Sequence, residues 1–156
     1  MDLPALELVT VGLTGEIDKS IRVPRVILGR LYQVQDELTV VRTSGNRLLY
    51  RFASTGLSGQ ICIADDTGEI LVLHDSDPRP VNSSLEKFNE CVRVVIDRFP
   101  YYGVDSARED QERVGRELAE LLTAIDPVPL QVDSFWDTFI TDVEIGDFAT
   151  EEVTGL

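Results

Sequence analysis

QICIADDTGEILVLH, residues 60–74, is the stretch of the chain that decides its fold class. Two apolar runs, residues 60–64 and 69–74, are separated by Asp65-Asp66-Thr67-Gly68. An aspartate at the start of a turn can bond the backbone ahead of it, and glycine can take the left-handed conformation that closes a short loop. We therefore predict a β-hairpin. Because residues 70–73 are apolar without alternation, both faces of their strand should be covered, as in a central strand.

The segment before this hairpin has the pattern of a second one. Residues 38–42 and 47–53 are rich in Val, Leu, Tyr and Phe. Ser44-Gly45-Asn46 lies between them and supplies residues that tolerate a positive φ. Apolar residues and arginines alternate in the second run, which is typical of a strand with one face more exposed than the other.

Three other stretches in the first half are less regular. We expect residues 6–11 to form an edge strand or a short helix, and residues 22–34 to contain a strand. Residues 75–80 include Pro78 and Pro80, which bar a helix, so we expect a loop there.

The rest of the chain has the spacing of three amphipathic helices, near residues 83–99, 106–125 and 134–145. Each range begins at or next to a serine that is followed three residues later by an acidic residue, the pattern of a helix start. These pairs are Ser83 with Glu86, Ser106 with Glu109, and Ser134 with Asp137. The expected helix ends are Pro100, Asp126-Pro127 and Gly146.

Strands first and helices later predict an α+β fold, with a largely antiparallel sheet partly covered by helices. A chain of 156 residues is about the size of one domain and can bury a real core. We find no internal repeat, low-complexity tract or linker that would divide it. Residues 1–156 are therefore expected to form a single domain, with a short acidic tail at 149–156 that frays.

The charge of the chain is strongly negative and unevenly placed. Lys and Arg number 14 against 28 Asp and Glu, and nothing basic follows Arg116. Proteins that bind nucleic acid or anionic membranes need a basic surface, so this composition favours neither and suits a basic protein partner. The alternative is that the acidity only keeps the chain soluble. Because no apolar run exceeds four residues, we expect a cytoplasmic protein without a membrane span.

No set of residues has the spacing of a catalytic or cofactor site. Cys62 and Cys91 form no CxxC pair and His74 is the only histidine, so we expect free buried thiols and no metal site. Asp66-Thr67-Gly68 matches the nucleophilic triplet of aspartic proteases, but turn chemistry explains it fully. No phosphate-binding loop of the G-x-x-x-x-G-K type is present. The sequence therefore predicts a protein that is not an enzyme and uses no cofactor.

Several short motifs, taken in order, resemble the SUKH superfamily of bacterial immunity proteins, and its fourth subgroup in particular. The hairpin with its Asp-Asp-Thr-Gly turn is followed by Val81-Asn82-Ser83-Ser84-Leu85 and Phe88. The other matching motifs are Val11-Gly12-Leu13, Ile125-Asp126-Pro127, Phe135-Trp136, and Gly146 within residues 143–148. The resemblance covers residues 11–148 in order and spacing.

This resemblance implies a mixed α+β domain without enzymatic activity. Members of the superfamily are found beside polymorphic toxins, often nucleases or nucleic-acid deaminases, which they bind and block. The expected partner is therefore a cognate protein toxin, and the acidity of the chain suggests that the toxin is basic. The alternative function is that of a scaffold or regulatory protein-interaction module with a similar fold.

The charge pattern of the last predicted helix gives a candidate docking surface. Trp136, Phe139, Ile140 and Val143 form its buried stripe, and acidic residues lie off that stripe. Phe135-Trp136 is expected either to pack in the core or to contact the partner. The predicted partner-binding residues are Asp133, Trp136, Asp137, Asp142, Glu144 and Asp147. A solvated acidic face without a partner is the alternative, in which case the segment 75–84 would be the next docking candidate.

Overall fold

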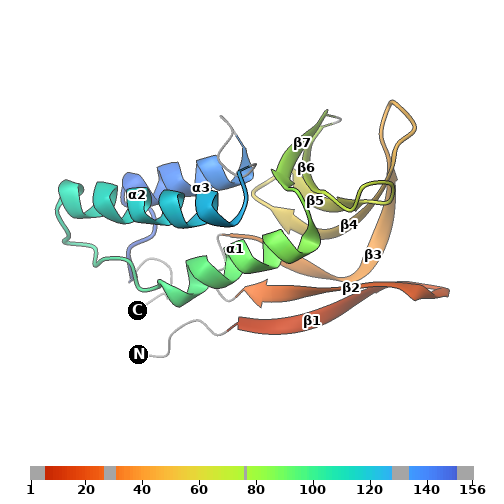
Figure 1. Cartoon of the computed structure of the whole chain (residues 1–156), viewed down its shortest axis with the longest axis horizontal. Coiled ribbons are helices and arrows are strands. Elements are labelled where there is room, and N and C mark those ends of the chain that lie inside the picture. Colours follow the sequence, from red (N-terminus) through yellow and green to blue (C-terminus); the bar gives the residue numbers. More distant parts are fainter. Residues whose placement is uncertain (1–5, 27–30, 76, 128–133, 151–156) are drawn as a thin grey trace.

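A computed structural model describes residues 6–26, 31–75, 77–127 and 134–150 of the chain (Figure 1). The described residues form a seven-stranded sheet with the order β2-β1-β3-β4-β5-β6-β7, followed by three helices. The strands are β1 Leu6–Leu13, β2 Glu16–Val26, β3 Gln33–Arg42, β4 Leu48–Thr55, β5 Gly59–Ala64, β6 Ile70–His74 and β7 Asp77–Asn82. The helices are α1 Leu85–Asp97, α2 Arg108–Ile125 and α3 Phe135–Glu144.

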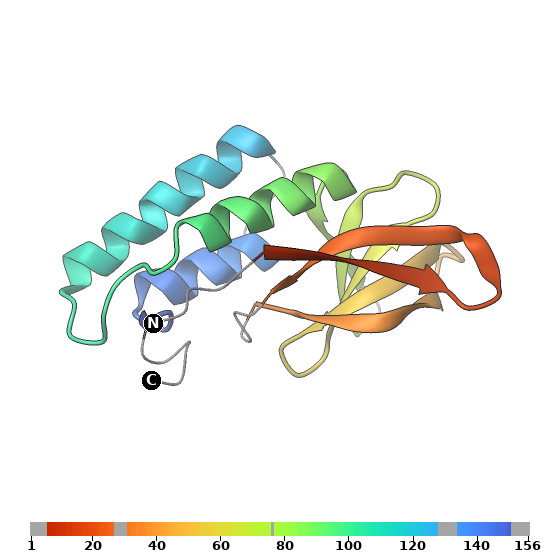
Figure 2. The same cartoon turned by 90° about the horizontal axis from the view of Figure 1, so that it is seen from below.

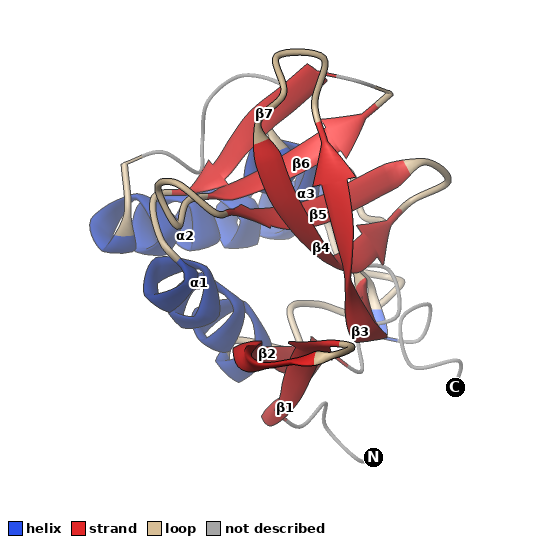
Figure 3. Cartoon of the chain, turned by 90° about the vertical axis from the view of Figure 1, so that its right-hand side faces the viewer, coloured by secondary structure: helices blue, strands red, loops and turns tan. Residues whose placement is uncertain are grey.

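This arrangement confirms the predicted α+β class and the largely antiparallel sheet. Neighbouring strands pair antiparallel except β1 and β3, which are parallel and share the pair Gly12–Glu37. In Figure 3 the strands β4–β6 face the viewer, and α2 and α3 lie behind them. Helix α1 contacts both α2 and β2, and Figure 2 shows it between α2 and the β1–β2 hairpin. None of the helices within the described ranges is long and apolar enough to span a bilayer.

Phe88 of α1 is at the centre of the main hydrophobic core. Its ring lies 5.6 Å from Tyr32, 5.7 Å from Phe52 and 6.3 Å from Trp136, measured between ring centroids. These aromatic contacts join the sheet to two helices, and each adds about 0.5–1.5 kcal/mol beyond the area it buries.

A second, smaller apolar cluster lies on the other face of the sheet. Its buried members are Leu49, Cys62, Ala64, Leu71 and Leu73. Strand β6 contributes to both clusters, because Ile70 and Val72 belong to the main core. All four residues 70–73 are buried, so the prediction that both faces of this strand are covered is confirmed.

Both edges of the sheet are protected against pairing with another strand. At β2, Asn89 Nδ2 of α1 donates to the Arg22 carbonyl at 3.0 Å, and the Tyr32 hydroxyl donates to the Pro24 carbonyl at 2.7 Å. At β7, Pro78 and Pro80 lack the N–H groups that a further strand would need. Strands β7 and β2 are therefore poorly suited to binding a partner by strand addition.

The prediction of a loop over residues 75–80 is wrong, because strand β7 occupies Asp77–Asn82. Its two prolines face Leu73 and Leu71 across the β6–β7 pair. Proline is tolerated in an edge strand because the missing N–H can point away from the sheet. Strand β1 also differs from the expectation of an edge strand or short helix, since it lies between β2 and β3.

The predicted helix ranges are confirmed, but two of the three predicted starts are wrong. Helix α1 is capped by Ser84, whose Oγ accepts from Lys87 N at 3.2 Å, and not by Ser83. Helix α2 has Ala107 at its N-cap and no side-chain cap. Helix α3 begins as predicted, because Ser134 Oγ accepts from Asp137 N at 3.2 Å. It ends at Glu144, and Gly146, just after the C-cap Ile145, has a φ of +95° that only glycine adopts readily.

We expected a frayed tail to begin at residue 149, but the first two residues of that range are held in place. Phe148 and Ala149 are buried, and Thr150 N and Oγ1 both donate to the Tyr102 carbonyl at 2.9 and 3.0 Å. The remainder of the predicted tail lies outside the described residues.

Candidate functional site

Motif residues from three distant parts of the chain meet in a buried polar network, which we call the Asp126 network. Oδ2 of Asp126 accepts hydrogen bonds from Asn82 Nδ2 at 3.1 Å, Ser83 N at 2.8 Å and Ser83 Oγ at 3.1 Å. Oδ1 of Asn82 accepts from Trp136 Nε1 at 2.8 Å. Asn82 and Asp126 are only 0% and 2% exposed. The network ties the end of β7 to the end of α2 and the start of α3.

The network also explains why Ser83 is not the helix cap. Its backbone and hydroxyl groups are both used by Asp126, and the adjacent Ser84 caps α1 instead. Sequence spacing alone favoured Ser83, since Glu86 follows it by three residues. A tertiary contact across 43 positions decided between the two serines.

Cys91 lies beside this network, and its thiol has little tendency to ionise. Asn82 Nδ2 approaches its Sγ atom at 3.4 Å. Burial raises the pKa of the Cys91 thiol to about 11, and burial raises the pKa of the Cys62 thiol to about 12. Both cysteines are free and buried, as predicted, and both thiols are protonated at neutral pH.

The Asp-Asp-Thr-Gly turn is held by an ion-pair cluster at one end of the sheet. Arg47 Nη2 lies 3.2 Å from Oδ1 of Asp66 and 2.7 Å from Oε1 of Glu69. Hydrogen bonds from Arg47 hold the pKa of the Asp66 carboxyl below its usual range. Gly68 closes the turn with a φ of +75°. These contacts account for the Asp66-Thr67-Gly68 triplet as part of the turn between β5 and β6.

Helix α3 carries the predicted acidic residues, but they do not share one face. Asp137 and Glu144 are seven residues apart and lie on the same side of the helix. Asp142 lies about 140° around the axis from Asp137, because it follows by five residues. Asp147 is exposed beyond the helix end, and Asp133 lies outside the described residues.

Trp136, which also belongs to the predicted partner-binding set, lies in the core. Its side chain is completely buried, and its ring packs 4.9 Å from Phe135 and 5.9 Å from Phe139, measured between centroids. A tryptophan this deep in the core offers no surface to a partner. Core packing, one of the two alternatives for Phe135-Trp136, is therefore what Trp136 does.

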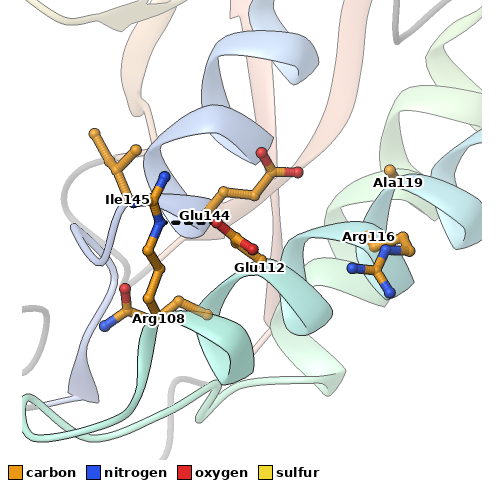
Figure 4. Close-up of a pocket in the computed structure, with 7 residues that line it drawn as sticks. Arg108, Glu112, Arg116, Ala119, Glu144 and Ile145 are labelled. Atoms are coloured by element: carbon orange, nitrogen blue, oxygen red, sulfur yellow. Dashed lines mark hydrogen bonds and ion pairs between the residues drawn. The ribbon is translucent and has the colours of Figure 1, made fainter.

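On one side of α3, Glu144 borders a groove against α2, which we call the α2–α3 groove (Figure 4). Its volume is about 660 Å³. The residues around it include Arg108, Gln111, Glu112, Arg116, Glu144 and Ile145. Arg108 Nε pairs with Oε1 of Glu112 at 2.9 Å. This groove therefore carries charges of both signs.

Gly115 brings the two helices together at this groove. A Cβ atom at this position would lie 2.3 Å from Cγ of Glu144, far inside van der Waals contact. We expect Gly115→Ala to lower the free energy of unfolding by about 1–3 kcal/mol, the usual cost of overpacking. Urea denaturation followed by circular dichroism would measure this loss.

Glu144→Ala provides the control for this prediction, because it removes the Cγ atom that causes the clash. The double variant should recover at least the wild-type stability, since alanine is favoured over glycine inside a helix by about 1 kcal/mol. A double variant as unstable as Gly115→Ala alone would contradict the proposed contact.

On the other side of α3, Asp142 borders a hollow against the sheet, which we call the α3–sheet hollow. Its volume is about 230 Å³. Among the residues around it are Leu31, Gly56, His74, Phe139, Asp142 and Phe148. Sequence reasoning did not identify this hollow, because its walls come from β4, β6, α3 and segments that connect or follow them. The spacing of five between Asp137 and Asp142 was the one signal that the acidic residues point to different sides.

A search of the described residues found no group of three or more His, Cys, Asp or Glu side chains that could hold a metal ion.

Comparison with known proteins places the chain in a family. A family model described as SUKH-4 immunity protein matches residues 28–142. No curated protein and no solved structure matches the chain. The matched range contains all four members of the Asp126 network, whereas strands β1 and β2 and Gly146 lie outside it. The chain belongs to the SUKH-4 immunity protein family.

Proposed function

We propose that the chain neutralises a basic toxin, a nuclease or nucleic-acid deaminase, by binding it through the surface around α3. The family gives the immunity function and implies a cognate toxin. The observation that supports a basic partner is the net charge of −14, with no Lys or Arg between Arg116 and the last residue. Domains that bind nucleic acid are basic, and an acidic inhibitor attracts them over long distances.

Attraction of this kind acts mainly on the rate of association. Complementary charges raise association rates by roughly 10–10³-fold at low salt, and salt removes the gain. The described acidic residues of α3 are Asp137, Asp142 and Glu144, and this helix has no basic residue. They are therefore the positions at which a change of charge should matter most.

The test uses the purified chain and the toxin domain encoded beside its gene. In the variant Asp137→Lys, Asp142→Lys, Glu144→Lys, association should slow by about tenfold or more, and its salt dependence should flatten. Stopped-flow fluorescence at several salt concentrations measures both quantities.

A charge-matched control separates local from overall electrostatics. Asp36, Asp97 and Glu120 are exposed and lie outside α3. Reversing these three also changes the net charge from −14 to −8, since each reversal adds two charges. The association rate of the control variant should fall much less than that of the α3 variant. Equal losses in both would contradict docking at α3, and absence of binding by the unmodified chain would contradict the toxin as partner.

A further inference from the structure

The α3–sheet hollow combines an apolar floor with one carboxylate, that of Asp142, at its border. Leu31, Val72, Phe139 and Phe148 line it and are buried against the main core. Asp142 stands at its border, and no lysine or arginine is among the described residues that line it. This combination suits the side chain of a lysine or arginine, because the aliphatic stem packs on apolar surface while the charged end needs a carboxylate.

The turn between β4 and β5 carries a large apolar side chain one residue along the chain from the lining of this hollow. Gly56 lines the hollow with a φ of +60°, and the next residue, Leu57, is fully exposed, at 108% of its reference area. Single exposed leucines are common on protein surfaces. A leucine that directly follows a lining residue of an apolar hollow is different, because a partner that covers both can bury more apolar surface than either offers alone.

The position of this turn is fixed by close packing. A Cβ atom at Gly59 would lie 2.9 Å from Cε1 of His74 and 2.6 Å from Thr55, so the turn lies directly on the side chain of His74. Thr55 Oγ1 also donates to the Leu31 carbonyl at 2.9 Å. Because the turn is held in this way, little backbone entropy is lost when a partner binds Leu57.

The other side of α3 lacks this combination. The α2–α3 groove is lined by Arg108 and Arg116 as well as by Glu112 and Glu144, so it does not select for one sign of charge. The groove between α1 and β2 is likewise mixed, with Arg22 and Arg93 beside Glu86 and Glu90.

We propose that the α3–sheet hollow receives a lysine or arginine side chain of the toxin, and that Leu57 packs against the toxin segment that carries it. Asp142 accepts the hydrogen bonds of the cation, and the apolar floor contacts its stem. This inference rests on the proposed function, and it commits the docking surface to the sheet side of α3.

Two pairs of matched variants test the proposal with the toxin domain encoded beside the gene. Leu57→Ala and Asp142→Asn change the hollow, while Ile145→Ala and Glu112→Gln make the same kinds of change at the α2–α3 groove. Ile145 is a suitable control because it is also exposed, at 64%. Each of the first two variants should raise Kd about tenfold or more, and the two controls should stay within about twofold. Isothermal titration calorimetry measures Kd, and thermal unfolding verifies that each variant is folded.

A second measurement does not depend on affinity. Photoreactive p-benzoylphenylalanine placed at position 57 should cross-link to the toxin domain on illumination, and the same residue at position 145 should not. A larger rise in Kd in the two groove variants than in the two hollow variants would overturn the proposal while leaving toxin binding intact. Cross-linking from position 145 alone would do the same. If the unmodified chain does not bind the toxin domain at all, the proposed function fails and this inference fails with it.

Discussion

Asp126→Ala is expected to lower the free energy of unfolding by about 3 kcal/mol, because it removes the acceptor shared by three hydrogen bonds. The donors on Asn82 are buried and would lose their partner without gaining water. Hydrogen bonds to a charged group are each worth about 1.5–3 kcal/mol, and a buried donor left alone costs about 1–3 kcal/mol. Total stabilities of domains are only about 5–15 kcal/mol, so this loss would be large. Urea denaturation measures it directly.

Asp126→Asn is the matched control, since it nearly preserves the size of the side chain and keeps one oxygen acceptor, while an uncharged NH2 group replaces the other oxygen. We expect it to cost about 1–2 kcal/mol, clearly less than the alanine variant. Asn82→Ala combined with Asp126→Ala should cost less than the sum of the single variants, because the two residues belong to one network. Additive losses, or a loss below about 1 kcal/mol in Asp126→Ala, would contradict the role given to the network.

The position of the Asp126 network clarifies what the family motifs encode. Asn82, Ser83, Asp126 and Trp136 all occur in motifs that resemble the family, and all lie within the matched range. In the structure they hold β7, α2 and α3 together. Motifs of this kind identify a fold and say little about the surface that contacts a toxin. Leu57 and Asp142, which we propose contact the toxin, belong to none of those motifs.

Local features of the sequence predicted the local structure well. The hairpin of β5 and β6 follows from its turn residues and from the unbroken apolar run in β6. Helix α3 follows from Ser134 at its start and Gly146 after its end. Each of these signals lies within a few residues of the structure that it determines, and no distant contact overrides it.

Features decided by distant contacts could not be predicted in this way. Strand β7 forms despite two prolines because β6 offers it a pairing edge. Strand β1 joins the sheet through one parallel pair with β3, a partner more than twenty residues away. The candidate site depends on the same kind of information, since α3 carries its acidic residues on two sides and only the packing of α2 and the sheet gives each side its neighbours.

Trp136→Ala is expected to cost about 3–5 kcal/mol, the usual range for removing a large aromatic side chain from a core. The ring contacts Phe88, Phe135 and Phe139, and its Nε1 atom donates to Asn82. The loss therefore has two parts: a cavity among aromatic side chains, and an Asn82 oxygen deprived of its donor.

Trp136→Phe separates these parts and also tests whether Trp136 contributes to toxin binding. Phenylalanine keeps most of the ring contacts and removes the hydrogen bond, so we expect a loss of about 2 kcal/mol, less than that of alanine. Under conditions where this variant is fully folded, its affinity for the toxin domain should equal that of the unmodified chain, because the ring is inaccessible. Weakened toxin binding by a folded Trp136→Phe variant would instead indicate that Trp136 contacts the toxin. Because the ring is buried, such a contact would require α3 to rearrange when the toxin binds.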